Sequence, residues 1–282
     1  MPKRYIKIKM QDASIFIFGE EVPKIYPRSP EYKLVSYNKI EEPCDIEKIC
    51  VGDWHSYTLK MEHAYSEGAR IHALLHSSLL KKYVGTAHYR RYFKFFDKLP
   101  DLDKIFKKHD AICQIFDIGW PSIEANYKAC HNIEDLNLCI DIIKEKYPKY
   151  SESADFVMKH DFFIPCNIFI LKKEMFCKWA DFVYGVLFEF NQRMGFSTDL
   201  DVYNHVVNNM DKYVEGKGGL PNSSTAYQSR IHAFLMERLT TIFFKENIKN
   251  PYHEDIVLTE THFNFEKTYF CQYEKQDISD NN

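Results

Sequence analysis

The chain has 282 residues, 45% of them hydrophobic and 16% aromatic, which suits one large α/β domain or two small ones. Its net charge of −3 argues against a nucleic-acid binder that works through bulk positive charge. The apolar runs are too short to span a bilayer, and the basic residues 1–10 lack the apolar core of a signal peptide. The eight cysteines are scattered, with no C-x-x-C pair. We therefore expect a soluble, cytoplasmic protein whose thiols are reduced.

Helix and strand patterns alternate along the chain. Short apolar runs predict strands, and apolar residues at three- and four-residue steps predict helices. The expected elements are, in order, strands at 14–19 and 33–37, a helix at 57–80, a strand at 83–87, a helix at 102–109, a strand at 110–115, a helix at 133–146, a strand at 162–171, helices at 173–193, 200–210 and 230–245, and a terminal strand or hairpin within 255–273. This alternation favours an α/β fold with a mostly parallel central sheet and helices on both faces.

The same pattern gives the domain organisation that we expect. Residues 1–275 form a single domain, in which the polar, glycine-containing residues 195–228 are a loop-rich insertion around one helix. Residues 276–282 are polar and are expected to be a disordered tail. Pro165 predicts a bulge or a sheet edge in the first half of the strand at 162–171.

A short apolar strand, Tyr83 to Ala87, runs directly into His88-Tyr89-Arg90-Arg91-Tyr92-Phe93. A buried strand has no use for adjacent arginines, because burying an unpaired charge is costly. The strand should therefore leave the core and deliver these groups at its carboxyl end, where ligands bind in open α/β sheets. Guanidinium groups suit phosphate oxygens. The motif is either an anion site, such as one for a nucleotide diphosphate, or an exit loop whose arginines pair with carboxylates.

This motif and several later blocks resemble a known bacterial family. The run Tyr83-Val84-Gly85-x-x-His88-Tyr89-Arg90-Arg91-Tyr92-Phe93 is similar to the signature of a family long catalogued as a domain of unknown function and found in capsule and O-antigen gene clusters. The other matching blocks are Tyr65-Ser66-Glu67, Tyr127 with His131, Asp135-Leu136, Tyr147-Pro148-x-Tyr150, Asn167-Ile168-Phe169-Ile170 with Phe176, and Arg230 with Phe234-Leu235-x-Glu237-Arg238-Leu239. The chain departs from the family in its N-terminal segment, in the longer segment 191–230 and at residues 71–76, where the family has a tryptophan-rich run.

The resemblance implies a glycosyltransferase with a modified GT-A fold, since characterised members include galactofuranosyltransferases. It implies transfer of a sugar from a nucleotide-sugar donor, such as a UDP-linked one, with inversion at the anomeric carbon. The implied acceptor is a surface polysaccharide, in capsule or lipopolysaccharide, or its lipid-linked precursor. The departures from the family affect the donor-base pocket and the acceptor side.

An ordinary GT-A enzyme places a metal-binding Asp-x-Asp where this chain has His88-Tyr89-Arg90-Arg91. Because cationic groups can stabilise the charge on a leaving diphosphate, we expect these four residues to bind it without a metal or other cofactor. A buried, hydrogen-bonded His88 and a core-packed Tyr89 are the alternatives. The literal Asp-x-Asp, Asp199-Leu200-Asp201, follows Thr198 at a helix start, where capping is the preferred interpretation.

Inverting transfer needs a general base near the acceptor hydroxyl, commonly a carboxylate. The candidates are Asp161, which precedes the strand at 162–171, Glu237 in the late helix, and Glu67. A structural ion pair with Arg238 is the alternative for Glu237, and a brace between helix and loop is the alternative for Glu67.

Sugar or acceptor contacts are expected from Asn167, His131 and Arg238. Asn167 at a strand end either meets sugar hydroxyls or fastens the strand to a loop. His131 either lines the same cleft or lies on the surface.

Two other functions stay open on the sequence. The basic strand end would also serve a nucleotidyltransferase or phosphotransferase, and a non-catalytic protein that binds nucleotide or polysaccharide would use the same groups. A lipid-linked acceptor would require a peripheral contact at the inner face of the cell membrane. Three lysines are either part of such a contact or ordinary solvated helix residues: Lys172, Lys173 and Lys178.

Overall fold

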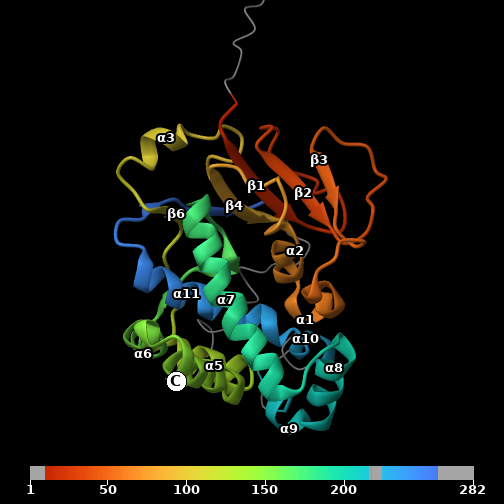
Figure 1. Cartoon of the computed structure of the whole chain (residues 1–282), viewed down its shortest axis with the longest axis vertical. Helices are drawn as coiled ribbons and strands as arrows, with labels where there is room; N and C mark the ends of the chain where they lie inside the picture. Colours follow the sequence, from red (N-terminus) through yellow and green to blue (C-terminus); the bar gives the residue numbers. More distant parts are fainter. Residues whose placement is uncertain (1–9, 216, 218–223, 260–282) are drawn as a thin grey trace, which may run out of the picture.

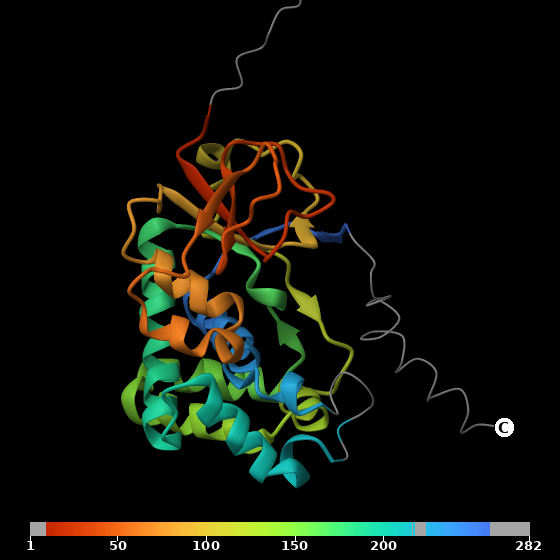
Figure 2. The same ribbon diagram turned by 90° about the vertical axis from the view of Figure 1, so that its right-hand side faces the viewer.

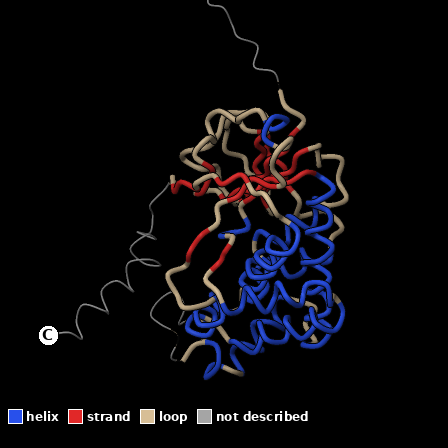
Figure 3. Tube along the Cα trace, turned by 90° about the vertical axis from the view of Figure 1, so that its left-hand side faces the viewer, coloured by secondary structure: helices blue, strands red, loops and turns tan. Residues whose placement is uncertain are grey.

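A computed structural model describes residues 10–215, 217 and 224–259. The expected tail at 276–282 and most of the expected hairpin at 255–273 lie outside these residues. The central sheet occupies one end of the molecule and most of the helices lie beneath it (Figure 1; Figure 3, strands in red).

The central sheet has the strand order β10-β6-β9-β4-β1-β2-β3. The strands in this order are β1 (Ala13–Phe18), β2 (Tyr32–Ser36), β3 (Glu47–Cys50), β4 (Tyr83–His88), β6 (Ala111–Cys113), β9 (Phe169–Lys172) and β10 (Tyr252–His253). Two further strands, β5 (Arg91–Phe93) and β11 (Ile256–Leu258), extend the sheet from the end of β4. β1 pairs in parallel with β2 and β4, and β2–β3 and β6–β10 are also parallel, whereas β9 runs antiparallel to its neighbours β4 and β6. The expected α/β fold with a mostly parallel sheet is confirmed.

The middle of the sheet is closely packed. Every residue of β1 is buried, as expected for a continuous apolar run covered on both faces. A side chain at Gly85 in β4 would place its Cβ 2.9 Å from Ile170 and 3.2 Å from Ile15. The glycine before the arginine motif therefore lets β4 fit between its two neighbouring strands.

Helices lie on both faces of the sheet, but unequally. One face packs on α2 (Glu67–Leu74), α7 (Lys173–Met194) and α11 (Ile231–Asn247), with α4 (Ile123–Cys130), α5 (Ile133–Lys146), η2 (Pro148–Tyr150) and α6 (Ser151–Lys159) around them (Figure 2). The other face is covered by loops and by α3 (Leu102–Ile105). None of the helices in the described residues is long and apolar enough to cross a membrane.

Two expected elements are interrupted, which corrects the sequence prediction. The helix expected at 57–80 is divided into η1 (Tyr57–Met61), α1 (Glu62–Tyr65) and α2, because Ser66 has φ 53° and ψ −129°, far from helical values. The strand expected at 162–171 is divided into β8 (Phe162–Phe163), the 3₁₀ turn η3 (Pro165–Asn167) and β9. β8 pairs with β7 (Phe116–Asp117) in a separate two-stranded sheet. β3, α4 and α6 were not expected.

The described part of segment 195–228 is mostly helical, with α8 (Asp199–Asn208), α9 (Met210–Tyr213) and α10 (Thr225–Gln228). The capping interpretation of its Asp-x-Asp is confirmed. Asp201 forms a capping box with Thr198, and Asp199 accepts the backbone N–H groups of His63 (3.0 Å) and Ala64 (2.9 Å).

Candidate functional site

The arginine motif forms a tight hairpin at the carboxyl end of β4. His88 pairs with Arg91, the first residue of β5 (Arg91–Phe93). The outer edge of β5 pairs with β11 (Ile256–Leu258), and the N–H of Thr259 donates to the Arg90 carbonyl at 2.9 Å. β1 ends beside the hairpin, since Phe18 pairs with His88.

A cluster of cationic groups surrounds His88, which we call the arginine cluster: Arg70, Arg90, Arg91 and Arg230. Burial and the nearby arginines, Arg91 first among them, hold the pKa of His88 well below its usual range, so its imidazole is neutral. The buried Nδ1 of His88 and the buried Nε of Arg90 have no hydrogen-bond partner among the described residues.

The aromatic residues of the motif divide between the cluster and the core. The Arg90 guanidinium lies over the Tyr89 ring at 4.7 Å, and the ring of His88 lies 4.4 Å from that of Tyr89. Tyr92 is fully buried and donates its hydroxyl to the Tyr89 carbonyl at 2.9 Å. Tyr92 is thus a core residue, while Tyr89 stays half-buried beside Arg90.

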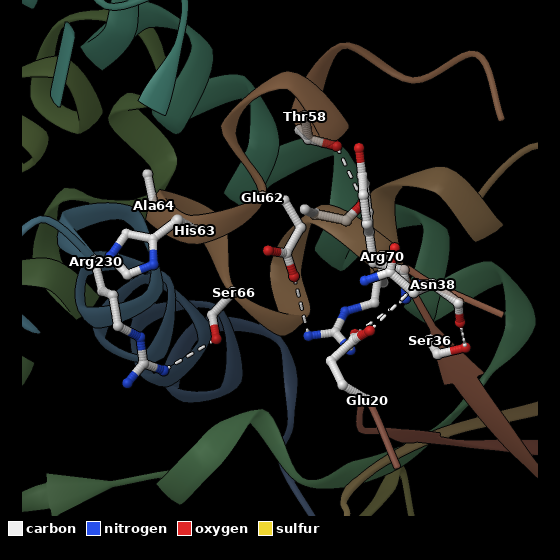
Figure 4. Close-up of polar contacts among 12 residues, drawn as sticks. Glu20, Ser36, Asn38, Thr58, Glu62, His63, Ala64, Ser66, Arg70 and Arg230 are labelled. Atoms are coloured by element: carbon white, nitrogen blue, oxygen red, sulfur yellow. Dashed lines mark hydrogen bonds and ion pairs between the residues drawn. The ribbon is translucent and has the colours of Figure 1, made fainter. Parts of the chain in front are cut away.

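Arg70 lies between two carboxylates (Figure 4). Its guanidinium contacts Glu20 at 2.7 Å and Glu62 at 3.3 Å. Glu20 also accepts the backbone N–H groups of Tyr37 (3.0 Å) and Asn38 (3.2 Å), which ties the end of β1 to the end of β2. These contacts hold Arg70 next to the carboxyl ends of β1 and β2.

Two of the predicted carboxylates, Glu67 and Glu237, lie beside this cluster. Both oxygens of Glu237 already accept hydrogen bonds: Oε1 from the Cys166 N–H and Oε2 from Arg238, each at 2.9 Å. Burial raises the pKa of Glu237 above its usual range. Glu67 accepts one hydrogen bond at Oε1, from Asn167 at 3.2 Å, and its other oxygen has no partner among the described residues.

The side chain of Asn167 is oriented by a buried chain of hydrogen bonds. The Thr240 hydroxyl accepts the Trp179 indole N–H at 3.1 Å, so its own hydrogen goes to Asn167 Oδ1 at 2.9 Å. The amide nitrogen of Asn167 therefore faces Glu67. Asn167 is only 1% exposed, which leaves this buried side chain to hold Glu67 in place.

Backbone strain gathers at the same place. The non-glycine residues with positive φ among the described residues are Ser66 (53°), Cys166 (54°) and Asn167 (51°). Ser66 precedes Glu67 and accepts a hydrogen bond from Arg230 at 3.0 Å (Figure 4), while Cys166 and Asn167 bind the two carboxylates. Such conformations persist only where the surrounding structure imposes them, and they cluster at functional sites.

Among the described residues, Asp161 has a carboxyl contact with Asp117 and no hydrogen bond or ion pair with the arginine cluster. Asp161 lies at the end of β8 that is farther from Cys166, with its carboxyl group in contact with that of Asp117 in the two-stranded sheet. Glu67 and Glu237 are therefore the better placed of the three candidate bases.

His131 and Arg238 are packed behind the site. His131 is 5% exposed, stacks on Phe234 at 3.9 Å and bonds Gln228 at 3.1 Å, so the surface alternative for this residue is wrong. Burial holds the pKa of His131 well below its usual range. Arg238 pairs with Glu237 and lies over the rings of Tyr127 and Phe163. His131 and Arg238 therefore stabilise the site by packing in the protein interior.

Sequence reasoning did not assign a site role to Arg70, Arg230, Ser66 or Cys166. Arg70 follows Glu67 by three residues on one helix, a spacing that places both side chains on the same side of it. Arg230 immediately precedes α11. The positions of Ser66 and Cys166 depend on backbone conformations that no sequence pattern indicated.

Comparisons with known proteins agree with this fold. A family model described as "Domain of unknown function (DUF4422)" matches residues 62–208, just over half of the chain. The chain belongs to this family. The DUF4422 match contains the arginine motif, Glu67 and Asn167, whereas Arg230 and Glu237 lie beyond it.

A search of curated proteins gave no match. Among solved structures, the apo form of the bifunctional glycosyltransferase WbbM is similar at 16% sequence identity, with a TM-score of 0.63 over 89% of this chain. The match covers 46% of the WbbM chain, so the present chain spans about half of that protein. This similarity shows a shared fold.

Proposed function

We propose that this DUF4422 protein is a glycosyltransferase that moves a sugar from a nucleotide-sugar donor to a surface-polysaccharide acceptor, of capsule or lipopolysaccharide type. The observation that carries the proposal is the arginine cluster at the carboxyl ends of β1 and β4, facing carboxylates held by strained backbone. The fold shared with WbbM, a bifunctional glycosyltransferase, supports it.

In the proposed reaction, Arg90 and Arg91 bind the donor diphosphate, together with Arg230. As the bond from the anomeric carbon to the diphosphate oxygen breaks, negative charge grows on the leaving group. Fixed guanidinium groups in a partly dry site stabilise that charge. The unpartnered buried Nε of Arg90 is a donor that such a ligand would satisfy. This cluster would replace the metal of ordinary GT-A enzymes.

Glu67 is the proposed general base. It accepts the proton of the acceptor hydroxyl as that oxygen attacks the anomeric carbon on the face opposite the leaving diphosphate, and this single displacement inverts the anomeric configuration. Glu67 has a carboxylate oxygen that is not hydrogen-bonded among the described residues, whereas both oxygens of Glu237 are engaged. Asn167 then acts as a positioning residue for Glu67.

A panel of nucleotide sugars tests the proposal, with transfer or hydrolysis and thermal stabilisation by nucleotides as readouts. We expect a nucleotide diphosphate to raise Tm and at least one donor to be turned over. No turnover of any donor combined with no thermal shift would reject the function. Tighter binding of a nucleoside triphosphate than of every nucleotide sugar would instead favour a nucleotidyltransferase or phosphotransferase.

A chelator experiment tests the metal-independent step separately. We expect activity to be unchanged by EDTA, because guanidinium groups supply the positive charge. Loss of activity in EDTA and its return with manganese would show that the arginine cluster does not replace a metal.

A further inference from the structure

A pocket of about 280 Å³ lies between α2 and the loop that follows β3. It is lined by residues of segments 53–56 and 72–77. At 3.6 residues per turn, His72 lies about 140° around α2 from Glu67. One side of this helix therefore serves the arginine cluster, and the other serves the pocket.

The hydrogen-bond chain beneath the pocket fixes the protonation of His72. Thr58 donates its hydroxyl hydrogen to the Ala69 carbonyl at 3.1 Å, so the contact with Ser56 at 3.0 Å must be donated by Ser56. Ser56 has then no hydrogen left for His72, and the 2.8 Å contact is donated by His72 Nδ1. Nε2 of the neutral ring is left as an acceptor. Burial supports this state, because it lowers the pKa of His72 to about 4.

The walls of the pocket combine an aromatic surface with free polar groups. Trp54 is half-buried against the main core, and the buried Ala73 is the other apolar residue of the lining. Asp53, His55 and His76 are exposed at the rim and make no hydrogen bond or ion pair with any described residue. The Asp53 carboxylate and His72 Nε2 are acceptors that suit the hydroxyl hydrogens of a ligand.

We propose that this pocket is a carbohydrate-binding site that takes one neutral sugar ring of a glycan chain. Sugar rings offer an apolar face to an aromatic side chain and hydroxyl hydrogens to acceptors. The volume is slightly below the roughly 300 Å³ at which sites for drug-sized ligands begin, which limits the occupant to about one ring. The Asp53 carboxylate disfavours a phosphate or another anion here. Within the described residues, no group of three His, Cys, Asp or Glu side chains is placed to hold a metal ion.

This site is separate from the proposed transfer site, and its lining residues take no part in the proposed transfer reaction. It would hold a ring of the glycan outside the reacting centre, on the reverse side of the helix that carries Glu67. Such a second contact would raise the effective concentration of a long acceptor at the enzyme.

Indole ¹H–¹⁵N signals of the full chain provide the test, because the protein has three tryptophans. Methyl glycosides of galactose, glucose, mannose and N-acetylglucosamine are titrated, and Trp54→Phe assigns the Trp54 signal. We expect a saturable Trp54 shift with at least one glycoside, with a Kd of about 1–10 mM. Saturating uridine diphosphate should leave that shift in place.

Two rim variants and a matched control complete the test. Asp53→Asn and His76→Ala should weaken glycoside binding at least fivefold, whereas Asp45→Asn, at an exposed carboxylate before β3, should not change it. The proposal is overturned if no glycoside gives a saturable shift, if the rim variants bind like the control, or if uridine or uridine diphosphate displaces the glycoside. Glycoside binding together with a failed donor panel would reject only the transferase function.

Discussion

Two motifs of this chain carry closely spaced charges, and they use them in different ways. At the start of α8, the carboxylates of Asp199 and Asp201 each accept backbone N–H groups of nearby helix starts. At the end of β4, the buried Nδ1 of His88 and the buried Nε of Arg90 have no hydrogen-bond partner among the described residues. Charges that are fully hydrogen-bonded stabilise local structure, whereas buried polar groups without partners are sites that a ligand can complete.

The largest effect is expected at Glu67, the proposed general base. Glu67→Gln keeps the size of the side chain and removes the proton acceptor, so kcat should fall by about 10²–10⁴. Glu237→Gln, whose carboxylate is already engaged with Cys166 and Arg238, should lower kcat less than tenfold. Both are measured with a donor identified in the panel. A larger loss for Glu237→Gln than for Glu67→Gln would transfer the role of base to Glu237.

The second largest effect is expected on removal of Arg90, whose buried Nε has no partner among the described residues. Arg90→Ala should lower kcat/KM by about 10²–10³, the usual loss for one group that stabilises a developing oxyanion. Its Tm should stay close to that of the parent, because Arg90 makes no ion pair among the described residues. Arg28→Ala, at an exposed arginine in the loop before β2, is the matched control. Unchanged transfer by Arg90→Ala would show that this arginine has a structural role, like the capping carboxylates.

Asp135 on α5 shares one property with each motif. It is buried, at 3% exposure, like the groups at the end of β4, and it accepts a hydrogen bond, from Tyr213 on α9 at 2.9 Å, like the capping carboxylates. Burial raises its pKa to about 7, helped by Glu134 and opposed by the Tyr213 hydrogen bond and Lys212. The folded state therefore holds this proton more tightly than the unfolded state does. The stability contributed by Asp135 is present at acid pH and is lost as pH rises towards 7.

Unfolding in urea at pH 5 and pH 8 measures this loss. Between these values, Asp135→Asn should gain on the order of 2–4 kcal/mol relative to the parent, because the amide does not ionise. Asp141→Asn, exposed on the same helix, should show no such gain. A pH-independent difference between Asp135→Asn and the parent would mean that Asp135 does not ionise in this range.

The smallest effect is expected at the helix cap. Asp201→Ala removes the acceptor for the N–H groups of Ser197 and Thr198 and should lower the free energy of unfolding by about 1 kcal/mol. Transfer should be unchanged, since the cap does not touch the arginine cluster. Asp211→Ala on α9 serves as the comparison. A transfer defect larger than tenfold in Asp201→Ala would show that the Asp-x-Asp is functional.

Features encoded in a few neighbouring residues could be predicted from the sequence. The strand ending at His88, the capping by Asp199 and Asp201, and the long helix α7 all follow from local patterns. The late helix α11 does too, together with the α/β class. In each case the signal that predicts the element lies within one short stretch of sequence, although partners such as those of Asp199 are distant.

Features that depend on contacts between distant segments could not be predicted. The break at Ser66 interrupts an apolar period that continues on both sides of it, and the Ser66 hydroxyl accepts a hydrogen bond from the distant Arg230, just before α11. Pro165 predicts a bulge or a sheet edge, but the turn that brings Cys166 and Asn167 to the carboxylates also uses hydrogen bonds with Glu237 and Thr240 of α11. The sequence predicts one continuous strand from Phe162 to Leu171, whereas the turn η3 separates the part that follows Asp161 from β9.

The pairing of β11 with β5 has a consequence for the order in which the site is assembled during synthesis. Thr259, which bonds the Arg90 carbonyl, follows that residue by 169 positions. Until the ribosome has released that stretch, the outer edge of the hairpin has no neighbouring strand, and an exposed edge invites pairing with other chains. The edge of the hairpin that carries Arg90 is therefore completed only after most of the helical layer has been synthesised.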